Sequence, residues 1–253
     1  MVAAHKKFPM PKDNIYLPVL VGAVKNYKEG INYQRDDDGE NISLKNPNYN
    51  ELTAIYWAWK NLDADVIGLV HYRRLFSKGG KRKLDNILTE SDIESLLDRA
   101  PIILPKKRKY YIETNYSHYI HAHHKEPLDV TRKVIEENYP KYLNAFDKVM
   151  KRRSAHMFNM FIMKNKEFEQ YATWLFGVLF ETESRIDTSE YSVQEARVFG
   201  YLSELLMDVW IETENIKCIQ ANWIQIGPRK MYQKIYNFLI RKFLPRRKKN
   251  THF

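Results

Sequence analysis

The chain has 253 residues, of which 44% are apolar and 13% aromatic, so it is long enough for one large globular domain and too apolar for an intrinsically disordered protein. Its net charge of +10 implies an anionic partner such as a nucleic acid, an acidic lipid or a phosphorylated substrate. The single cysteine, Cys218, excludes an internal disulfide and fits a reducing compartment.

Neither a membrane-spanning helix nor a signal peptide is predicted. No stretch approaches the roughly 20 consecutive apolar residues that a spanning helix needs. Residues 1–8 lack the apolar core of a signal peptide. We therefore expect a cytoplasmic protein that is soluble or bound peripherally to a membrane.

The N-terminal part predicts short strands and an acidic turn. Residues 2–4 and 19–23 are apolar strand candidates, and several prolines mark the loop between them. Residues 36–41 read Asp-Asp-Asp-Gly-Glu-Asn. Clustered carboxylates can bind Mg²⁺ or Mn²⁺, but most such runs are solvated turns.

A helix and a buried strand follow in residues 45–74. The helix is indicated by one apolar face with spacing i, i+3, i+4, i+7, formed by Leu52, Ile55, Tyr56 and Trp59. Asn48 is expected to cap this helix, with Glu51 completing a capping box. Residues 66–70 are apolar and rich in β-branched side chains, which predicts a buried parallel strand.

Four polar residues leave this strand at its carboxyl end, namely His71, Tyr72, Arg73 and Arg74. In open α/β sheets, ligands bind outside the carboxyl ends of the strands. Arginine presents a planar fork of donors that matches phosphate oxygens, so an arginine pair suits a diphosphate. The alternative is a solvated strand end in which Tyr72 packs against one arginine.

Residues 75–111 predict a basic loop, a helix capped by Ser91 with Glu94, and a strand at 102–104. The run of cations at 106–109 precedes Tyr110 and Tyr111 and fits either a nucleic-acid patch or a mobile active-site loop that attracts phosphate. No recognised RNA- or DNA-binding signature accompanies it, which favours the loop.

Four histidines lie within seven residues, at His118, His121, His123 and His124. Histidine is the commonest metal ligand, and His121 and His123 would share a face of an extended segment. No cysteine lies nearby, and structural zinc usually needs four ligands. Binding of sugar hydroxyls, binding of a metal and plain structural hydrogen bonding therefore all remain open.

The rest of the domain predicts helices at 128–138, 142–150 and 168–180, a core strand at 157–163 that contains Asn159, and short closing strands at 217–219 and 223–226. A further long helix is expected to open at Ser192. As a carboxylate, Glu195 in its first turn is a candidate general base, a role that requires it to lie within reach of the group that it deprotonates. The alternative is that the carboxylate only complements the helix dipole.

Residues 229–249 form a basic amphipathic segment with aromatic residues on its apolar face. This pattern is typical of helices that lie on anionic membranes. The alternative is a helix packed on its own domain. We therefore divide the chain into a domain at 1–227 and a C-terminal extension at 228–253.

Residues 45–61, joined to residues 68–74, resemble a family of bacterial capsular and exopolysaccharide glycosyltransferases that was formerly catalogued as a domain of unknown function. The resemblance runs from Val2 to about Gly227. It implies an α/β fold with a single GT-A-like (Rossmann-like) domain, whose mixed central sheet is flanked by helices. It also implies transfer of galactofuranose or another hexose from a UDP-sugar to a lipid-linked or oligosaccharide acceptor, which we expect to proceed with inversion.

Together, the residue patterns and the resemblance predict a set of site residues. Glu195 is the catalytic base. The donor-binding residues are Ala4, His5, Lys6, Asp38, Asn41, Asn46, Asn48, Tyr49, Glu51, His71, Tyr72, Arg73, Arg74 and Arg197. The acceptor-binding residues are His121, His123, His124 and Asn159.

The requirement for a metal stays open, because no Asp-x-Asp motif ends a buried strand, where many GT-A enzymes bind Mn²⁺. Either arginines replace Mn²⁺ or Mg²⁺, or His71 and the turn at 36–38 supply ligands. We expect the protein to be cytoplasmic and peripheral at the inner face of the plasma membrane. Two other functions are weighed: a basic nucleic-acid-binding module and a non-catalytic peripheral membrane scaffold. Nucleic acid is not the expected partner, because it leaves residues 46–51 unexplained.

Overall fold

An eight-stranded mixed sheet forms the centre of the protein in the computed structural model, which describes residues 1–80 and 82–227. The strand order is β3-β2-β1-β4-β5-β10-β6-β9. The strands are β1 (Val2–Ala4), β2 (Pro18–Leu20), β3 (Gln34–Arg35), β4 (Val66–His71), β5 (Arg74–Ser77), β6 (Ile102–Pro105), β9 (Phe161–Lys164) and β10 (Cys218–Gln225). A separate two-stranded sheet pairs β7 (Arg108–Lys109) with β8 (Ser154–Ala155).

Part of the large sheet closes on itself. β9 pairs with β6 and also with β4, so β4, β5, β10, β6 and β9 form a small barrel-like ring. Gly68 of β4 lies against β9, where an added Cβ would stand 2.9 Å from Ile162 Cγ1 and 3.1 Å from the Phe161 carbonyl oxygen. A side chain at position 68 would therefore hold the two strands apart.

The open half of the sheet contains a topological switch point. β1 is parallel to β2 on one side and to β4 on the other, and β2 is parallel to β3. The chain therefore builds outward from β1 to β3 and then returns to the opposite side of β1. Ligands of open α/β sheets bind at such a crevice, at the carboxyl ends of the strands.

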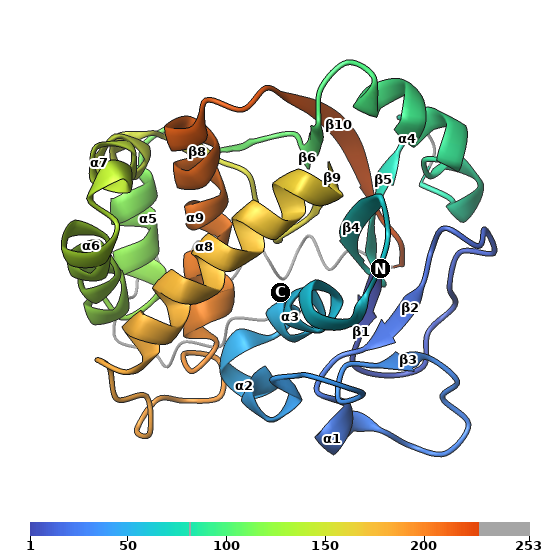
Figure 1. Ribbon diagram of the computed structural model, residues 1–253, viewed down its shortest axis with the longest axis horizontal. Helices are drawn as coiled ribbons and strands as arrows, with labels where there is room; N and C mark the ends of the chain where they lie inside the picture. Colours follow the sequence, from blue (N-terminus) through green and yellow to red (C-terminus); the bar gives the residue numbers. More distant parts are fainter. Residues whose placement is uncertain (81, 228–253) are drawn as a thin grey trace.

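Helices flank the sheet (Figure 1). The described residues contain α1 (Ala23–Asn26), α2 (Asn46–Tyr49), α3 (Leu52–Asn61), α4 (Glu90–Leu97), α5 (Asn115–Ala122), α6 (Glu126–Asn138), α7 (Leu143–Lys151), α8 (Asn165–Glu183) and α9 (Val198–Glu214), with 3₁₀ turns at Ser43–Lys45, Leu84–Asn86 and Pro140–Tyr142. In Figure 1, α5, α6 and α7 gather at the left, opposite β1, β2 and β3, and α8 and α9 cross the middle. α8 packs on α3, α6, α9 and β9, which joins the helical side to the sheet.

Alternating side chains of the central strands build two cores. In β4, Ile67 and Leu69 face the larger cluster under α3, α8 and α9, whereas Val70 faces the smaller cluster with β5, α4 and β10. In β1, Ala3 faces the larger cluster and Val2 faces the smaller one. This two-residue alternation explains why short apolar strands are buried on both faces.

Most predicted elements are confirmed, but the capping prediction for the first long helix is wrong. Asn50 has a positive φ of 52° and interrupts the helical conformation between α2 and α3. Glu51 is then the N-cap position of α3, and its side chain accepts a hydrogen bond from Asn159. The Asn48 amide instead donates to the Ala196 carbonyl oxygen. Hydrogen bonds to residues far away in the sequence therefore replace the predicted local cap.

Four other local predictions are corrected. α4 is capped by a box between Thr89 and Asp92, not by Ser91 and Glu94. His121 lies in helix α5, so it does not share a strand face with His123. The helix expected at Ser192 begins at Val198, after a series of turns. The two short closing strands are one strand, β10, because it pairs with β6 through its first half and with β5 through its second half.

The basic segment at 229–249 lies outside the described residues, as does the extension at 228–253. Among the residues that are described, no helix has the length and apolar character needed to cross a membrane.

Candidate active site

Four basic side chains, three of them cationic at neutral pH, gather at the switch point of the sheet. His5 and Lys6 follow β1, Arg73 follows β4, and Arg197 is the N-cap residue of α9. Burial lowers the pKa of His5, and the positive charges of Lys6, Arg197 and Arg73 lower it further. Lys6, Arg73 and Arg197 therefore lie close enough to His5 to act on its charge, although three different parts of the chain contribute these four side chains.

Arg73 has hydrogen-bonding capacity to spare. Its Nε atom is buried, and no residue in the described part of the chain accepts a hydrogen bond from it. Its guanidinium lies 5.7 Å from the ring centre of Tyr72, which also meets the rings of His5 and Phe8 edge to face. This aromatic packing holds the end of β1 against the end of β4 and keeps Arg73 at the crevice.

Two carboxylates lie beside the cations. Glu51 accepts from Asn159 Nδ2 at 2.7 Å, and Glu204 of α9 accepts from the Phe158 backbone N–H at 3.0 Å. The Arg74 guanidinium lies 4.4 Å from the centre of the Phe158 ring. Residues 158 and 159, just before β9, thus link both carboxylates to the start of β5.

The protonation of Glu204 is set by this environment. Burial raises its pKa to about 8, and the negative charge of Glu51 acts in the same direction. The Phe158 N–H and the charges of Arg74 and Arg108 oppose this increase only in part. Glu204 is therefore mostly protonated at neutral pH, and it can gain or lose its proton at pH values close to neutral.

His71 is fixed in one orientation. Its Nε2 atom is hydrogen-bonded to the Phe158 carbonyl oxygen, and a carbonyl can only accept, so Nε2 carries the proton. Burial lowers the pKa of His71, a decrease that the charge of Glu51 and the bond to Phe158 partly offset. The neutral ring therefore ties the end of β4 to the segment before β9.

The backbone is strained at this place. Asn50, Phe158 and Asn159 all have positive φ, of 52°, 76° and 51°, which L-residues other than glycine rarely adopt. Such conformations cost about 1–3 kcal/mol each and persist where the surroundings enforce them. The enforcing contacts are visible here: Arg197 Nε donates to Asn50 Oδ1 at 2.8 Å, and Asn159 Nδ2 donates to the Gly200 carbonyl oxygen at 3.0 Å.

Glu204 was not predicted from the sequence, although the spacing of polar residues in α9 indicates it. Arg197, Tyr201, Glu204 and Asp208 recur every three or four residues along α9, a helix that is otherwise mostly buried. This spacing places them on one face. A polar stripe on a buried helix is uncommon and identifies the face that lines the crevice.

The structure brings together many of the predicted donor-binding residues at or beside the crevice. These are Ala4, His5, Lys6, Glu51, His71, Tyr72, Arg73, Arg74 and Arg197. Asn159, predicted on the acceptor side, lies with them and contacts Glu51.

Three other predicted donor residues make contacts within the scaffold. Asn46 Nδ2 donates to Thr53 Oγ1, and Asn48 Nδ2 donates to the Ala196 carbonyl oxygen just before α9. The buried Tyr49 stacks on Phe199 and donates to Glu183. Asn46 thus ties α2 to α3, and Asn48 and Tyr49 hold α2 against α8 and the start of α9.

The residues of the acidic turn at 36–41 form hydrogen bonds with other residues of the protein. Asp36 is fully buried and accepts four hydrogen bonds, from the backbone of Gly22 and Ala23 and the hydroxyls of Ser43 and Thr53. The Asp38 carbonyl oxygen accepts from Trp57, and Asn41 donates to the carbonyl oxygens of Asp37 and Gly39. Across residues 1–80 and 82–227, no three His, Cys, Asp or Glu side chains converge closely enough to hold a metal ion.

The predicted acceptor histidines lie along α5 and the turn after it. His123 stacks on Tyr201 with ring centres 3.9 Å apart, and His124 stacks on Tyr191 at 4.1 Å. His124 Nε2 also lies 3.4 Å from a carboxylate oxygen of Glu195. These two stacked pairs form a row of rings. Because Tyr201 belongs to the polar stripe on α9, the row lies next to the crevice.

His121 and Glu195 form hydrogen bonds of their own. The Glu113 carboxylate bridges His118 and His121, at 2.7 Å and 2.8 Å. Glu195 accepts a hydrogen bond from the Ser192 hydroxyl at 2.7 Å in the turn before α9.

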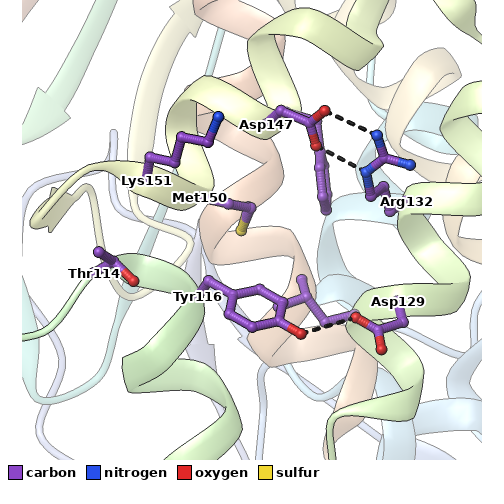
Figure 2. Close-up of a pocket in the computed structure, with 9 residues that line it drawn as sticks. Thr114, Tyr116, Asp129, Arg132, Asp147, Met150 and Lys151 are labelled. Atoms are coloured by element: carbon purple, nitrogen blue, oxygen red, sulfur yellow. Dashed lines mark hydrogen bonds and ion pairs between the residues drawn. The ribbon is translucent and has the colours of Figure 1, made fainter.

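A surface pocket of about 390 Å³ lies elsewhere, among α5, α6 and α7 (Figure 2). Its charged groups satisfy one another: Arg132 forms two bonds with Asp147, and Tyr116 donates to Asp129. Because these groups are already paired, the pocket offers a ligand few free polar partners. The crevice at β1 and β4 remains the better candidate.

Comparison with known proteins agrees with the mixed α/β architecture. The chain is similar to the apo structure of the WbbM bifunctional glycosyltransferase, with 29% sequence identity and a TM-score of 0.83. The match covers 90% of this chain and 45% of WbbM, so the chain spans less than half of that protein. No curated protein matches. The family model for a domain of unknown function, DUF4422, matches residues 1–215. The chain therefore belongs to the DUF4422 family.

Proposed function

We propose that this protein is a glycosyltransferase that moves a sugar from a UDP-sugar to a lipid-linked or oligosaccharide acceptor. The observation that carries this proposal is the group of cations at the switch point between β1 and β4. The similarity to WbbM supports it. Galactofuranose or another hexose as the donor sugar, and capsular or cell-surface polysaccharide as the product, complete the proposal.

The proposed domain at 1–227 is GT-A-like, with the nucleotide at the carboxyl ends of β1 and β4. Arg73 has a free buried donor for a diphosphate oxygen, and Arg74 and Arg197 add charge around the same crevice. Charge builds up on the diphosphate as the glycosidic bond breaks. Fixed cations at that position stabilise the transition state more than the ground state.

The proposed reaction is a single displacement with inversion. The acceptor hydroxyl oxygen attacks the anomeric carbon, the bond from that carbon to the diphosphate oxygen breaks, and a carboxylate takes the hydroxyl proton. Glu195 is the proposed base, because it lies beside His124 in the row of rings proposed to bind the acceptor. Glu204 is the competing choice, because its pKa of about 8 makes it the stronger base once it is ionised.

Removal of divalent metal ions tests whether arginines alone neutralise the diphosphate. The ligands considered from the sequence are engaged elsewhere, since Asp36 accepts four hydrogen bonds and His71 bonds to Phe158. We therefore expect sugar transfer to continue in excess EDTA, with arginines neutralising the diphosphate. Activity that is lost in EDTA and restored only by Mn²⁺ or Mg²⁺ would contradict this expectation.

Calorimetric titration with UDP and UDP-sugars is the deciding experiment. Arg73→Gln should weaken UDP binding roughly 10- to 100-fold, because a charge-assisted hydrogen bond contributes about 1.5–3 kcal/mol. The matched control is Arg185→Gln, which removes an arginine that pairs with Glu137 and Glu181. Absence of UDP binding, or equal affinity in the two variants, would overturn the proposal.

A further inference from the structure

Two large apolar side chains stand in solvent between β7 and α5. Tyr111 is 78% exposed and Ile112 is 80% exposed. The loop is nevertheless tied down: Tyr110 N–H donates to the Arg153 carbonyl oxygen at 2.8 Å, and Ile112 N–H donates to the Tyr110 carbonyl oxygen at 2.7 Å. Tyr111 itself is held at φ 59°, a left-handed conformation that a non-glycine residue adopts only under constraint.

Cations surround this pair. Lys106, Arg108, Lys109 and Arg153 are all exposed, and in the described part of the chain none of them forms an ion pair. The acidic groups nearby are already engaged: Asp208 by Lys107 and His156, and Glu113 by two histidines. The tip of the loop is therefore strongly positive around an apolar centre.

We propose that residues 106–112, with Arg153, dock on an anionic lipid bilayer and insert Tyr111 and Ile112 at the level of the headgroups. An apolar pair rimmed by lysine and arginine fits the boundary between acyl chains and acidic headgroups, and each cation near such a surface strengthens the attraction to it. A second copy of this chain is a poorer partner, because it would bring the same cations face to face. Nucleic acid would leave Ile112 without an apolar partner.

The loop lies next to the candidate active site. Arg108 lowers the pKa of Glu204, and Tyr110 stacks on His118 with ring centres 4.0 Å apart. Docking would therefore place the crevice beside the bilayer surface, where a lipid-linked acceptor is held. This consequence rests on the proposed function, whereas the docking itself does not.

A fluorescent label tests the contact in the full chain. Cys218→Ser removes the single thiol, after which Ile112→Cys carries an environment-sensitive fluorophore. The control carries the same label at Val193→Cys, since Val193 is 90% exposed in a different loop. Phosphatidylcholine vesicles that contain about a quarter phosphatidylglycerol should shift the emission at position 112 to the blue and leave position 193 unchanged. Pure phosphatidylcholine vesicles should produce a much smaller shift.

An unlabelled variant gives an independent measurement. Tyr111→Ser combined with Ile112→Ser should weaken sedimentation with the anionic vesicles roughly tenfold, while Val193→Ser should not change it. No shift at position 112, or equal shifts at both positions, would overturn the proposal. A shift without vesicles that grows with protein concentration would assign the surface to a second copy, and a shift caused only by an oligonucleotide would assign it to nucleic acid. UDP affinity is measured separately, so failure of the donor site is distinguishable from failure of the membrane contact.

Discussion

Glu204 shows how one position in a helix sets the chemistry of a side chain. The same residue on an exposed face would be ionised at neutral pH. Here burial removes it from water and Glu51 repels its negative charge, so its pKa rises from 4.5 to about 8. A carboxyl group in this state is partly ionised just above neutral pH, where it is most useful for moving protons.

Glu204→Gln should change how stability depends on pH. Because the folded protein holds this proton between about pH 4.5 and pH 8 and the unfolded chain does not, wild-type stability falls as the pH rises through that range. Glutamine can still accept from the Phe158 N–H and never ionises. We expect nearly equal free energies of unfolding at pH 5 and a variant that is more stable by about 4 kcal/mol at pH 9, measured by urea denaturation.

Glu212→Gln is the matched control, on the exposed side of the same helix. Hydrogen bonds from Lys148 and Arg152 lower the pKa of Glu212, so its contribution is present above the unfolded pKa and is lost only as the pH falls. No change in pH dependence between pH 5 and pH 9 is expected for this variant. If Glu204→Gln behaves in the same way, the assignment for Glu204 is wrong.

At the scale of elements, α9 organises the site. Its N-cap residue Arg197 holds Asn50, its Gly200 carbonyl oxygen holds Asn159, and Glu204 receives the Phe158 N–H. One helix thus fixes both of the strained backbone segments that face the crevice. The absence of a side chain at Gly200 lets this packing form, since an added Cβ would stand 2.8 Å from Asn50 Nδ2.

Gly200→Ala should weaken ligand binding while leaving the free energy of unfolding nearly unchanged. Alanine favours the helix by up to about 1 kcal/mol, while its Cβ displaces the Asn50 amide that anchors Arg197. We expect a free energy of unfolding within about 1 kcal/mol of wild type and UDP affinity reduced roughly five- to tenfold. Gly177→Ala is the control, because its Cβ meets only the Tyr139 hydroxyl, in the helix packing of α8. A UDP affinity unchanged in both variants would show that Asn50 does not position Arg197.

At the scale of the whole molecule, closure of β4 onto β9 joins the two halves of the fold. The open strands β1, β2 and β3 supply the crevice, and the ring of β4, β5, β10, β6 and β9 makes β4 rigid. β4 belongs to both parts, so the residues that follow it are placed by both.

Gly68→Ala should weaken this junction. The new Cβ would meet Ile162 Cγ1 at 2.9 Å and the Phe161 carbonyl oxygen at 3.1 Å, and backbone cannot move aside cheaply. We expect a loss of about 1–3 kcal/mol in the free energy of unfolding, measured by urea denaturation. Val66→Ala on the same strand, where Val66 is 40% exposed, should cost less than about 1 kcal/mol. Equal losses would mean that the close approach of β4 and β9 contributes nothing.

The sequence by itself determined the local elements and the chemistry after β4. The apolar run at 66–70 and the helical spacing from Leu52 to Trp59 depend on near neighbours, so patterns of two and 3.6 residues were enough to find them. Arg73 and Arg74 were identified because any strand buried in an open α/β sheet delivers the next residues to its edge.

Only the tertiary structure decided which distant residues meet. The cap expected at Asn48 gave way to contacts with Ala196 and Asn159, and the long closing strand β10 formed because β5 and β6 offered edges to both of its halves. The raised pKa of Glu204 depends first on its burial and then on Glu51, which lies more than a hundred residues earlier in the chain. Desolvation and charge act through space, so local patterns could reveal the stripe on α9 but not the environment that it faces.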